Sequence, residues 1–145
     1  MGLLGRLLRR RAPEPVVLDP DDPSLVVRVE AFDPARADSS VLAAAAERGV
    51  DLDEPLLVRH HLVALPDEAV VARTAALLAQ DGYALSAPQP GPRGLTVLAT
   101  RTQVVTALSA SQERSRMAGL AQRLGGDVPG WDAIGPDPDA SATSP

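Results

Sequence analysis

The 145-residue sequence contains no cysteine and no lysine, and it has one residue each of Trp, Tyr and Phe. Without cysteine, the chain can form no disulfide, no thiolate zinc site and no thiol nucleophile. With so few aromatic side chains, its core must be assembled from many small contacts and is expected to be thin. The scarcity also argues against an RNA-recognition sheet, because such a sheet carries stacking aromatics on its open face.

Long apolar runs are also missing, so we expect a cytoplasmic protein without stable membrane insertion. Residues 1–11 place four leucines at helical spacing among four arginines. An amphipathic helix there would allow weak association with a membrane surface or a partner's groove. The alternative is a disordered basic start, because two glycines weaken so short a helix.

Charge is segregated along the chain. The net charge is +4 over residues 1–11, −5 over 12–33, zero over 34–126 and −4 over 127–145. A neutral middle with acidic flanks is not typical of a protein held by phosphate contacts. We therefore expect no direct nucleic-acid binding, unless arginines cluster in space.

The length fits one domain with extensions. We expect a disordered Arg- and Pro-rich segment over 1–23, a strand–helix extension over 24–50, a domain over 51–135 and a disordered acidic tail over 136–145. No cofactor motif stands out in any of these parts, and the two glycines of the hairpin at 91–94 do not open a helix that could bind phosphate.

Residues 55–134 follow the order strand–helix–strand twice, joined by a turn at 88–94. Two such units predict an α+β fold, the ferredoxin-like βαββαβ sandwich, with a four-stranded antiparallel sheet and both helices on one face. The strands at 55–65 and 95–101 are the most apolar and are expected to be central. The expected strands cover 24–33, 55–65, 83–87, 95–101 and 127–134, and a further helix covers 35–48.

Capping residues mark the two helices of the domain. Asp67 is placed to cap the first helix, and Gly82 supplies its left-handed stop. Ser109 and Gln112 have the spacing of a capping box for the second helix. That helix is expected to bury Met117, Leu120, Ala121 and Leu124.

The two histidines are adjacent, at His60 and His61. Neighbours on a strand point to opposite faces, so the pair cannot close on one metal ion. One of them could act as a general base, but the sequence shows no nucleophile and no second metal ligand at a spacing typical of a catalytic or metal site. We expect His60 to be a satisfied core histidine under the helices and His61 to lie on the open face of the sheet.

The open face is the candidate site for a partner. Its expected members are Arg59, His61, Thr96, Leu98 and Thr100, with Trp131 nearby. With at most one aromatic there, a protein partner or a homodimer suits the face better than RNA. Alternatively, the strand–helix extension over 24–50 simply covers this face.

Four segments carry a family resemblance: VRHHL (58–62), PDEAVV (66–71), LLAQDGY (77–83) and AQRLGGDVPGWD (121–132). In order and spacing they resemble the bacterial regulator of ribonuclease E activity B family, the ribonuclease E inhibitor family. The resemblance runs from the turn at residue 51 to the strand with Trp131. It implies a ferredoxin-like fold and a non-catalytic role, in which the protein binds ribonuclease E and alters RNA turnover.

The chain departs from the family pattern in its leucine- and arginine-rich start, in the prolines and the strand at 24–33 that precede the shared part, and in lacking further aromatics after Trp131. These differences leave the identity of the partner open. The alternative function is a ferredoxin-like ligand-sensing or dimerisation module unrelated to RNA decay. An enzyme would require a pocket with converging polar groups around His60 or His61.

Overall fold

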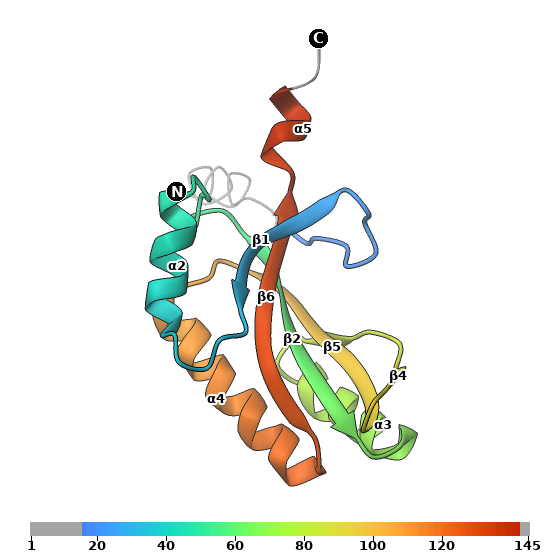
Figure 1. Ribbon diagram of the computed structural model, residues 1–145. Coiled ribbons are helices and arrows are strands. Elements are labelled where there is room, and N and C mark those ends of the chain that lie inside the picture. The colour runs from blue at the N-terminus through green and yellow to red at the C-terminus, as the bar shows by residue number, and fades with distance from the viewer. Residues whose placement is uncertain (1–15, 143–145) are drawn as a thin grey trace, which may run out of the picture.

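The computed structural model describes residues 16–142 and shows an α+β protein built on one antiparallel sheet (Figure 1). The predicted amphipathic segment 1–11 lies outside the described residues. The strands are β1 (Leu25–Ala31), β2 (Leu56–Leu65), β3 (Ala84–Leu85), β4 (Gln89–Gly91), β5 (Gly94–Gln103) and β6 (Asp127–Pro136). The helices are α2 (Asp38–Glu47), α3 (Glu68–Ala79), α4 (Ala107–Leu124) and α5 (Pro138–Ala142).

The sheet has the strand order β1-β6-β2-β5-β3, and β4 pairs directly with the first residues of β5. The α+β class and the antiparallel pairing are confirmed. The expected four strands become six within the described residues. One addition is β1, which pairs with β6, and the other is β4, which forms inside the turn expected at 88–94. The interior positions of β2 and β5 are confirmed, because each has strand neighbours on both sides.

Helices α2, α3 and α4 pack on one face of the sheet, where they enclose two hydrophobic clusters. The α2-side cluster consists of Val29, Ala31, Val41, Leu42, Ala45, Val50, Leu56, Val58, Val105, Ala110, Trp131 and Ala133. The α3-side cluster consists of Leu62, Leu65, Val71, Leu78, Tyr83, Val97, Ala99, Met117, Leu120 and Leu124. Helix α4 contributes to both clusters, and all four of its predicted core residues are buried.

The helix ends follow their sequence signals with one exception. Asp67 accepts a hydrogen bond from the Val70 N–H, and Gly82 has a left-handed φ of 82°, as predicted. The capping box of α4 was placed wrongly, because Thr106 caps the helix and Ser109 is its reciprocal partner. Gln112 takes no part in that box, since the helix already begins at Ala107.

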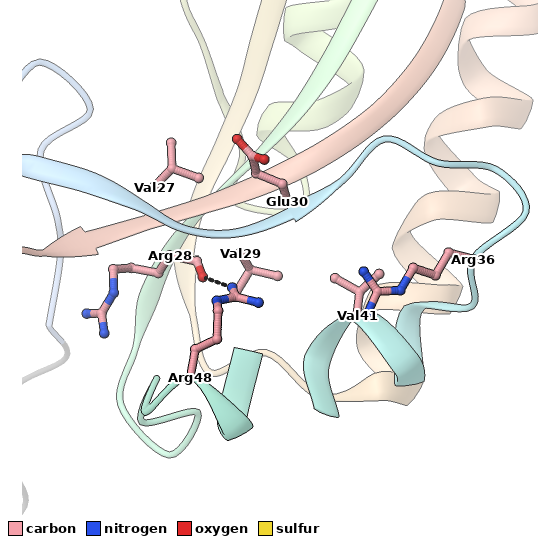
Figure 2. A pocket seen from close by; sticks show the side chains of 7 residues that line it. All are labelled: Val27, Arg28, Val29, Glu30, Arg36, Val41 and Arg48. Carbon is pink, nitrogen blue, oxygen red and sulfur yellow. Dashed lines mark hydrogen bonds between the residues drawn. The ribbon is translucent and has the colours of Figure 1, made fainter. Parts of the chain in front are cut away.

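The strand–helix extension does not cover the open face, so that alternative is wrong. Strand β1 lengthens the sheet beside β6, and α2 joins α4 on the face that the helices cover. The Arg48 guanidinium in α2 donates to the Arg28 carbonyl oxygen at 3.0 Å and so ties the helix to β1 (Figure 2). Instead, the segment before β1 reaches the open face, where the Leu18 N–H donates to Thr102 Oγ1 at 2.9 Å.

Candidate functional site

Alternation along β2 decides which side chains reach the open face. His60 and Leu62 point toward the helices, so Arg59 and His61 lie on the opposite side of the sheet. The register pairs Arg59 with Asp132 of β6 and with Thr100 of β5. These two neighbouring strands therefore bring a cation, a carboxylate and a hydroxyl together at the centre of the face.

Arg59 and Asp132 form a two-pronged ion pair. The Arg59 Nε donates to Asp132 Oδ1 at 2.8 Å, and Nη2 donates to Oδ2 at 2.7 Å. Burial alone would raise the pKa of Asp132, which is only 4% exposed, but its interactions with His61 and Arg59 outweigh burial and lower that pKa. Asp132 is therefore held as a carboxylate whose oxygens already have partners. It is better suited to orienting the Arg59 and His61 side chains than to transferring a proton.

His61 links this ion pair to an exposed aromatic ring. Its Nε2 lies 3.5 Å from Asp132 Oδ2, and its ring meets Phe32 edge to face with the ring centroids 4.9 Å apart. Phe32 is 40% exposed and packs over Gly130, where a side chain would collide with it. Paired charges with an exposed aromatic at the rim are typical of a protein-binding surface.

A hollow of about 320 Å³ opens beside Arg59. Pro20 and Asp21 from the segment before β1 form one wall, and the chain from β3 toward β4 forms another. The remaining lining residues are Ala84, Leu85, Ser86, Ala87, Leu98 and Thr100. The open face is thus recessed at one place, and its floor is partly apolar.

Of the six residues predicted for this face, the structure brings four together: Arg59, His61, Leu98 and Thr100. Thr96 is also on this side of the sheet but lines a separate hollow near the β4–β5 turn. Trp131 is not on the open face at all. It is 1% exposed, lies among the helices, and donates its Nε1–H to Asp38 Oδ1 at 3.1 Å.

His60 is buried under the helices as predicted, but it is not satisfied. It is 1% exposed, and neither ring nitrogen has a hydrogen-bond partner in the described structure. Burial lowers the pKa of His60 to about 4, with Glu113 opposing that shift. The ring is therefore neutral near pH 7, and its surroundings do not suit a general base with an oriented partner.

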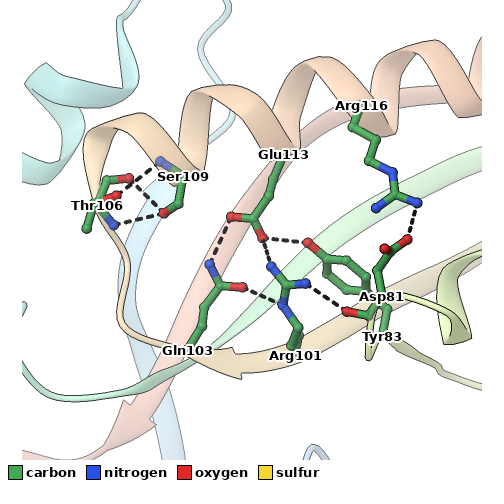
Figure 3. Close-up of polar contacts among 8 residues, drawn as sticks. All are labelled: Asp81, Tyr83, Arg101, Gln103, Thr106, Ser109, Glu113 and Arg116. Atoms are coloured by element: carbon green, nitrogen blue, oxygen red, sulfur yellow. Dashed lines mark hydrogen bonds and ion pairs between the residues drawn. The ribbon is translucent and has the colours of Figure 1, made fainter.

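A polar network lies on the helix side of the sheet (Figure 3), and its Tyr83 ring meets the His60 ring with the ring centroids 5.9 Å apart. Glu113 of α4 accepts hydrogen bonds from Tyr83 Oη at 2.5 Å, Arg101 Nη2 at 2.6 Å and Gln103 Nε2 at 2.8 Å. The Arg101 guanidinium also stacks over the Tyr83 ring, 4.2 Å from its centroid. These contacts fix α4 on β5 and on the turn before β3, so we assign the network a structural role.

Sequence reasoning missed Asp132 and Phe32. Asp132 directly follows the Trp of the Gly-Trp-Asp sequence, but its pairing with Arg59 depends on the register between β2 and β6, which no local pattern reveals. Phe32 offered a weak signal as the only phenylalanine of the chain. In the described residues, no group of three His, Asp or Glu side chains could hold a metal ion, and no helix is apolar and long enough to cross a membrane.

Comparison with known proteins adds one finding to this geometry. No curated protein and no solved structure matches the chain. A family model described as regulator of ribonuclease activity B matches residues 35–133, which is more than half of the chain and runs from just before α2 to near the end of β6. The chain therefore belongs to the regulator of ribonuclease activity B family.

Proposed function

We propose that this protein regulates RNA turnover by binding a ribonuclease, ribonuclease E or its counterpart, without cleaving RNA itself. Membership of a family of ribonuclease regulators is the observation that carries the proposal. The protein would act in the cytoplasm, where RNA is degraded. Its effect on the ribonuclease would come from occupying or reshaping a surface of that enzyme.

We assign the binding to the open sheet face around Arg59, His61, Leu98 and Thr100, with Phe32 at its rim. The Arg59–Asp132 pair supports this assignment, because its two hydrogen bonds hold both side chains in place on the open face. The exposed ring of Phe32 and the apolar floor of the hollow supply surface that a partner could bury.

The test measures how the purified protein changes cleavage of a defined RNA by ribonuclease E. We expect the unaltered protein to slow cleavage and to be recovered with ribonuclease E in a pull-down. Leu98→Glu places a charge in the centre of the open face and should abolish both effects. Leu77→Glu is the matched control, because Leu77 is exposed on α3 in the helix layer and should leave both effects intact.

Two results would contradict the proposal. If the unaltered protein neither binds ribonuclease E nor changes RNA half-lives on deletion from its host, the regulatory role is wrong. If Leu98→Glu remains folded by its melting temperature and still inhibits fully, the assignment to the open face is wrong while the regulatory role survives.

We also infer that β2, α3, β3, β5, α4 and β6 form a ferredoxin-like βαββαβ core, with β1, α2 and β4 as additions. The order β6-β2-β5-β3 with α3 and α4 on one face supports this inference. The 320 Å³ hollow favours one alternative function, a ligand-sensing or dimerisation module without an RNA role. A metabolite that raises the melting temperature, or a dimer that Leu98→Glu dissociates, would support that alternative.

A further inference from the structure

The outer edge of β1 has no strand partner in the part of the chain that the structure describes, although the Arg28 carbonyl oxygen accepts a hydrogen bond from Arg48. Strand β1 is the terminal strand of the sheet and has seven residues, which pair on one side with β6. An edge of this length presents backbone N–H and C=O groups that can accept a further strand. β1 also precedes residue 35, where the family match begins, so its surface is a feature of this chain beyond the matched region.

Three arginines gather along this edge (Figure 2). Arg28 comes from β1, Arg36 precedes α2, and Arg48 follows it. None of the three is paired with a carboxylate among residues 16–142, whereas Arg59, Arg101, Arg114 and Arg116 each have an acidic partner. Arg28 and Arg48 donate instead to backbone carbonyl oxygens, those of Pro136 and Arg28, both at 3.0 Å.

The arginines line a groove between β1 and α2 with a volume of about 390 Å³. Its floor is formed by Val29 and Val41, which are both buried. Glu30 is the one acidic lining residue, and Figure 2 shows its carboxylate on the other side of β1 from the guanidinium groups. The groove therefore combines an open strand edge, an adjacent helix and an excess of positive charge.

We propose that this groove binds an extended acidic segment of a protein partner, which adds to β1 as a seventh strand of the sheet. The backbone of the segment would pair with the β1 edge, and its carboxylates would meet Arg28, Arg36 and Arg48. This surface is separate from the open face, so the proposal stands or falls independently of the docking assigned there.

The charge of the groove favours an acidic protein segment over a second copy of the chain and over RNA. A second copy of the chain at the same edge would bring three like charges against these three, which disfavours pairing of β1 with itself. RNA would meet the arginines, but the chain carries a net charge of −5, and no aromatic ring lines the groove for base stacking. An acidic strand uses both the backbone edge and the arginines.

The test uses the full-length protein and a fluorescein-labelled peptide of sequence EVEVEVE, whose length matches β1. We expect saturable binding that weakens with salt and slower hydrogen exchange at β1 amides. Arg36→Gln/Arg48→Gln should weaken binding about tenfold or more. Arg73→Gln/Arg93→Gln removes the same charge from exposed sites outside the groove and should change binding by less than about twofold.

Further probes make the result decisive. A peptide with proline in place of the central valine cannot pair fully with the edge and should bind weakly, and KVKVKVK should not bind. The single variant Arg36→Gln guards against misfolding, because the Arg36 side chain has no hydrogen bond or ion pair in the described structure. No peptide binding, equal binding of the proline peptide, or tighter arginine-dependent binding of a short single-stranded RNA would each overturn the proposal.

Discussion

His60 places a neutral imidazole between the two hydrophobic clusters, and this single residue makes the fold sensitive to acid. The pKa of His60 is about 4 in the folded protein and about 6.5 in the unfolded chain. Between these values, the unfolded chain binds a proton that the folded protein does not. Stability is therefore complete above pH 6.5 and falls as the pH drops toward 4.

We expect His60→Leu to remove this dependence. The wild-type protein should lose roughly 3 kcal/mol of unfolding free energy between pH 7 and pH 4 through His60 alone. Leucine has no titrating group and leaves no unpaired nitrogen, so the variant should be at least as stable at pH 7 and clearly more stable at pH 5. Urea denaturation at several pH values measures both effects.

His61→Gln is the control for this experiment, because His61 lies on the other face of the sheet, where its side chain is 24% exposed. The acid-induced loss of stability should persist in that variant. A His60→Leu protein that still loses the same free energy between pH 7 and pH 4 would show that another group carries the proton linkage.

The Arg59–Asp132 pair gives a second prediction at this scale. Arg59→Leu leaves the nearly buried Asp132 carboxylate without its main partner and should cost about 3 kcal/mol of unfolding free energy. Asp132→Leu should cost less, because the Arg59 side chain is 22% exposed and can reach water. The double variant should be more stable than Arg59→Leu, and a double-mutant cycle of denaturation curves tests this coupling.

Strictly additive losses in that cycle would contradict the coupling.

The sequence predicted Arg59 and His61 on one face and His60 on the other, because alternation along a strand is a local property. It could not predict that His60 lacks hydrogen-bond partners or that Asp132 pairs with Arg59. Both facts depend on which distant side chains fold against β2.

Among the elements, β6 contains a glycine, Gly130, at which an added side chain would meet the backbone of a neighbouring segment. A Cβ added at Gly130 would collide with the Ala31 carbonyl oxygen and lie 2.7 Å from Phe32 Cδ1. We expect Gly130→Ala to push β1 away from β6 and to cost more than about 2 kcal/mol of stability. Loss of hydrogen-exchange protection at β1 amides would locate the damage.

Gly119 is the matched control, because a Cβ there meets nothing within 4 Å and the residue lies inside α4. Gly119→Ala should raise the unfolding free energy by about 0.5–1 kcal/mol through helix propensity. Equal effects of the two substitutions on the thermal midpoint would show that contact with Ala31 and Phe32 does not limit residue 130.

Helices and long strands were predictable because their periodicity and end signals are local. Asp67, Gly82 and the buried face of α4 all have the predicted roles. The capping box was misplaced because Ser109 can serve at either end of such a motif, and Thr106 three residues earlier completes it instead. The short strand β4 escaped notice because its pairing arises from the hairpin turn rather than from an apolar pattern.

In the whole molecule, the two hydrophobic clusters share α4, β2 and β6, so they should unfold together. The chain offers one natural probe in each: Trp131 in the α2-side cluster and Tyr83 in the α3-side cluster. We expect the denaturation curves from Trp131 fluorescence and Tyr83 absorbance to coincide. Leu78→Ala, which empties a fully buried site, should lower both midpoints equally and cost about 3 kcal/mol.

A Trp131 curve that stays in place while the Tyr83 curve moves would show two independent units. The matched substitution Val41→Ala on the α2 side should move both curves as well, by a smaller amount.

The α+β class and the antiparallel sheet were predictable from the order of elements. The position of β1 was not, because either edge of the sheet or its open face could have accepted that strand.

Strand β6 lies between β1 and β2, although it is the last of the six strands along the chain. The β1 residues at 25–31 therefore pair with residues 131–136, about a hundred positions later in the chain. Asp38 likewise accepts its hydrogen bond from the distant indole of Trp131. Pairings across so long a stretch of chain slow folding, and until they form the apolar residues of β1 remain uncovered. During synthesis on the ribosome, the nascent protein can close its sheet only after β6 has emerged, which makes the preceding interval the time of greatest exposure to aggregation and to chaperones.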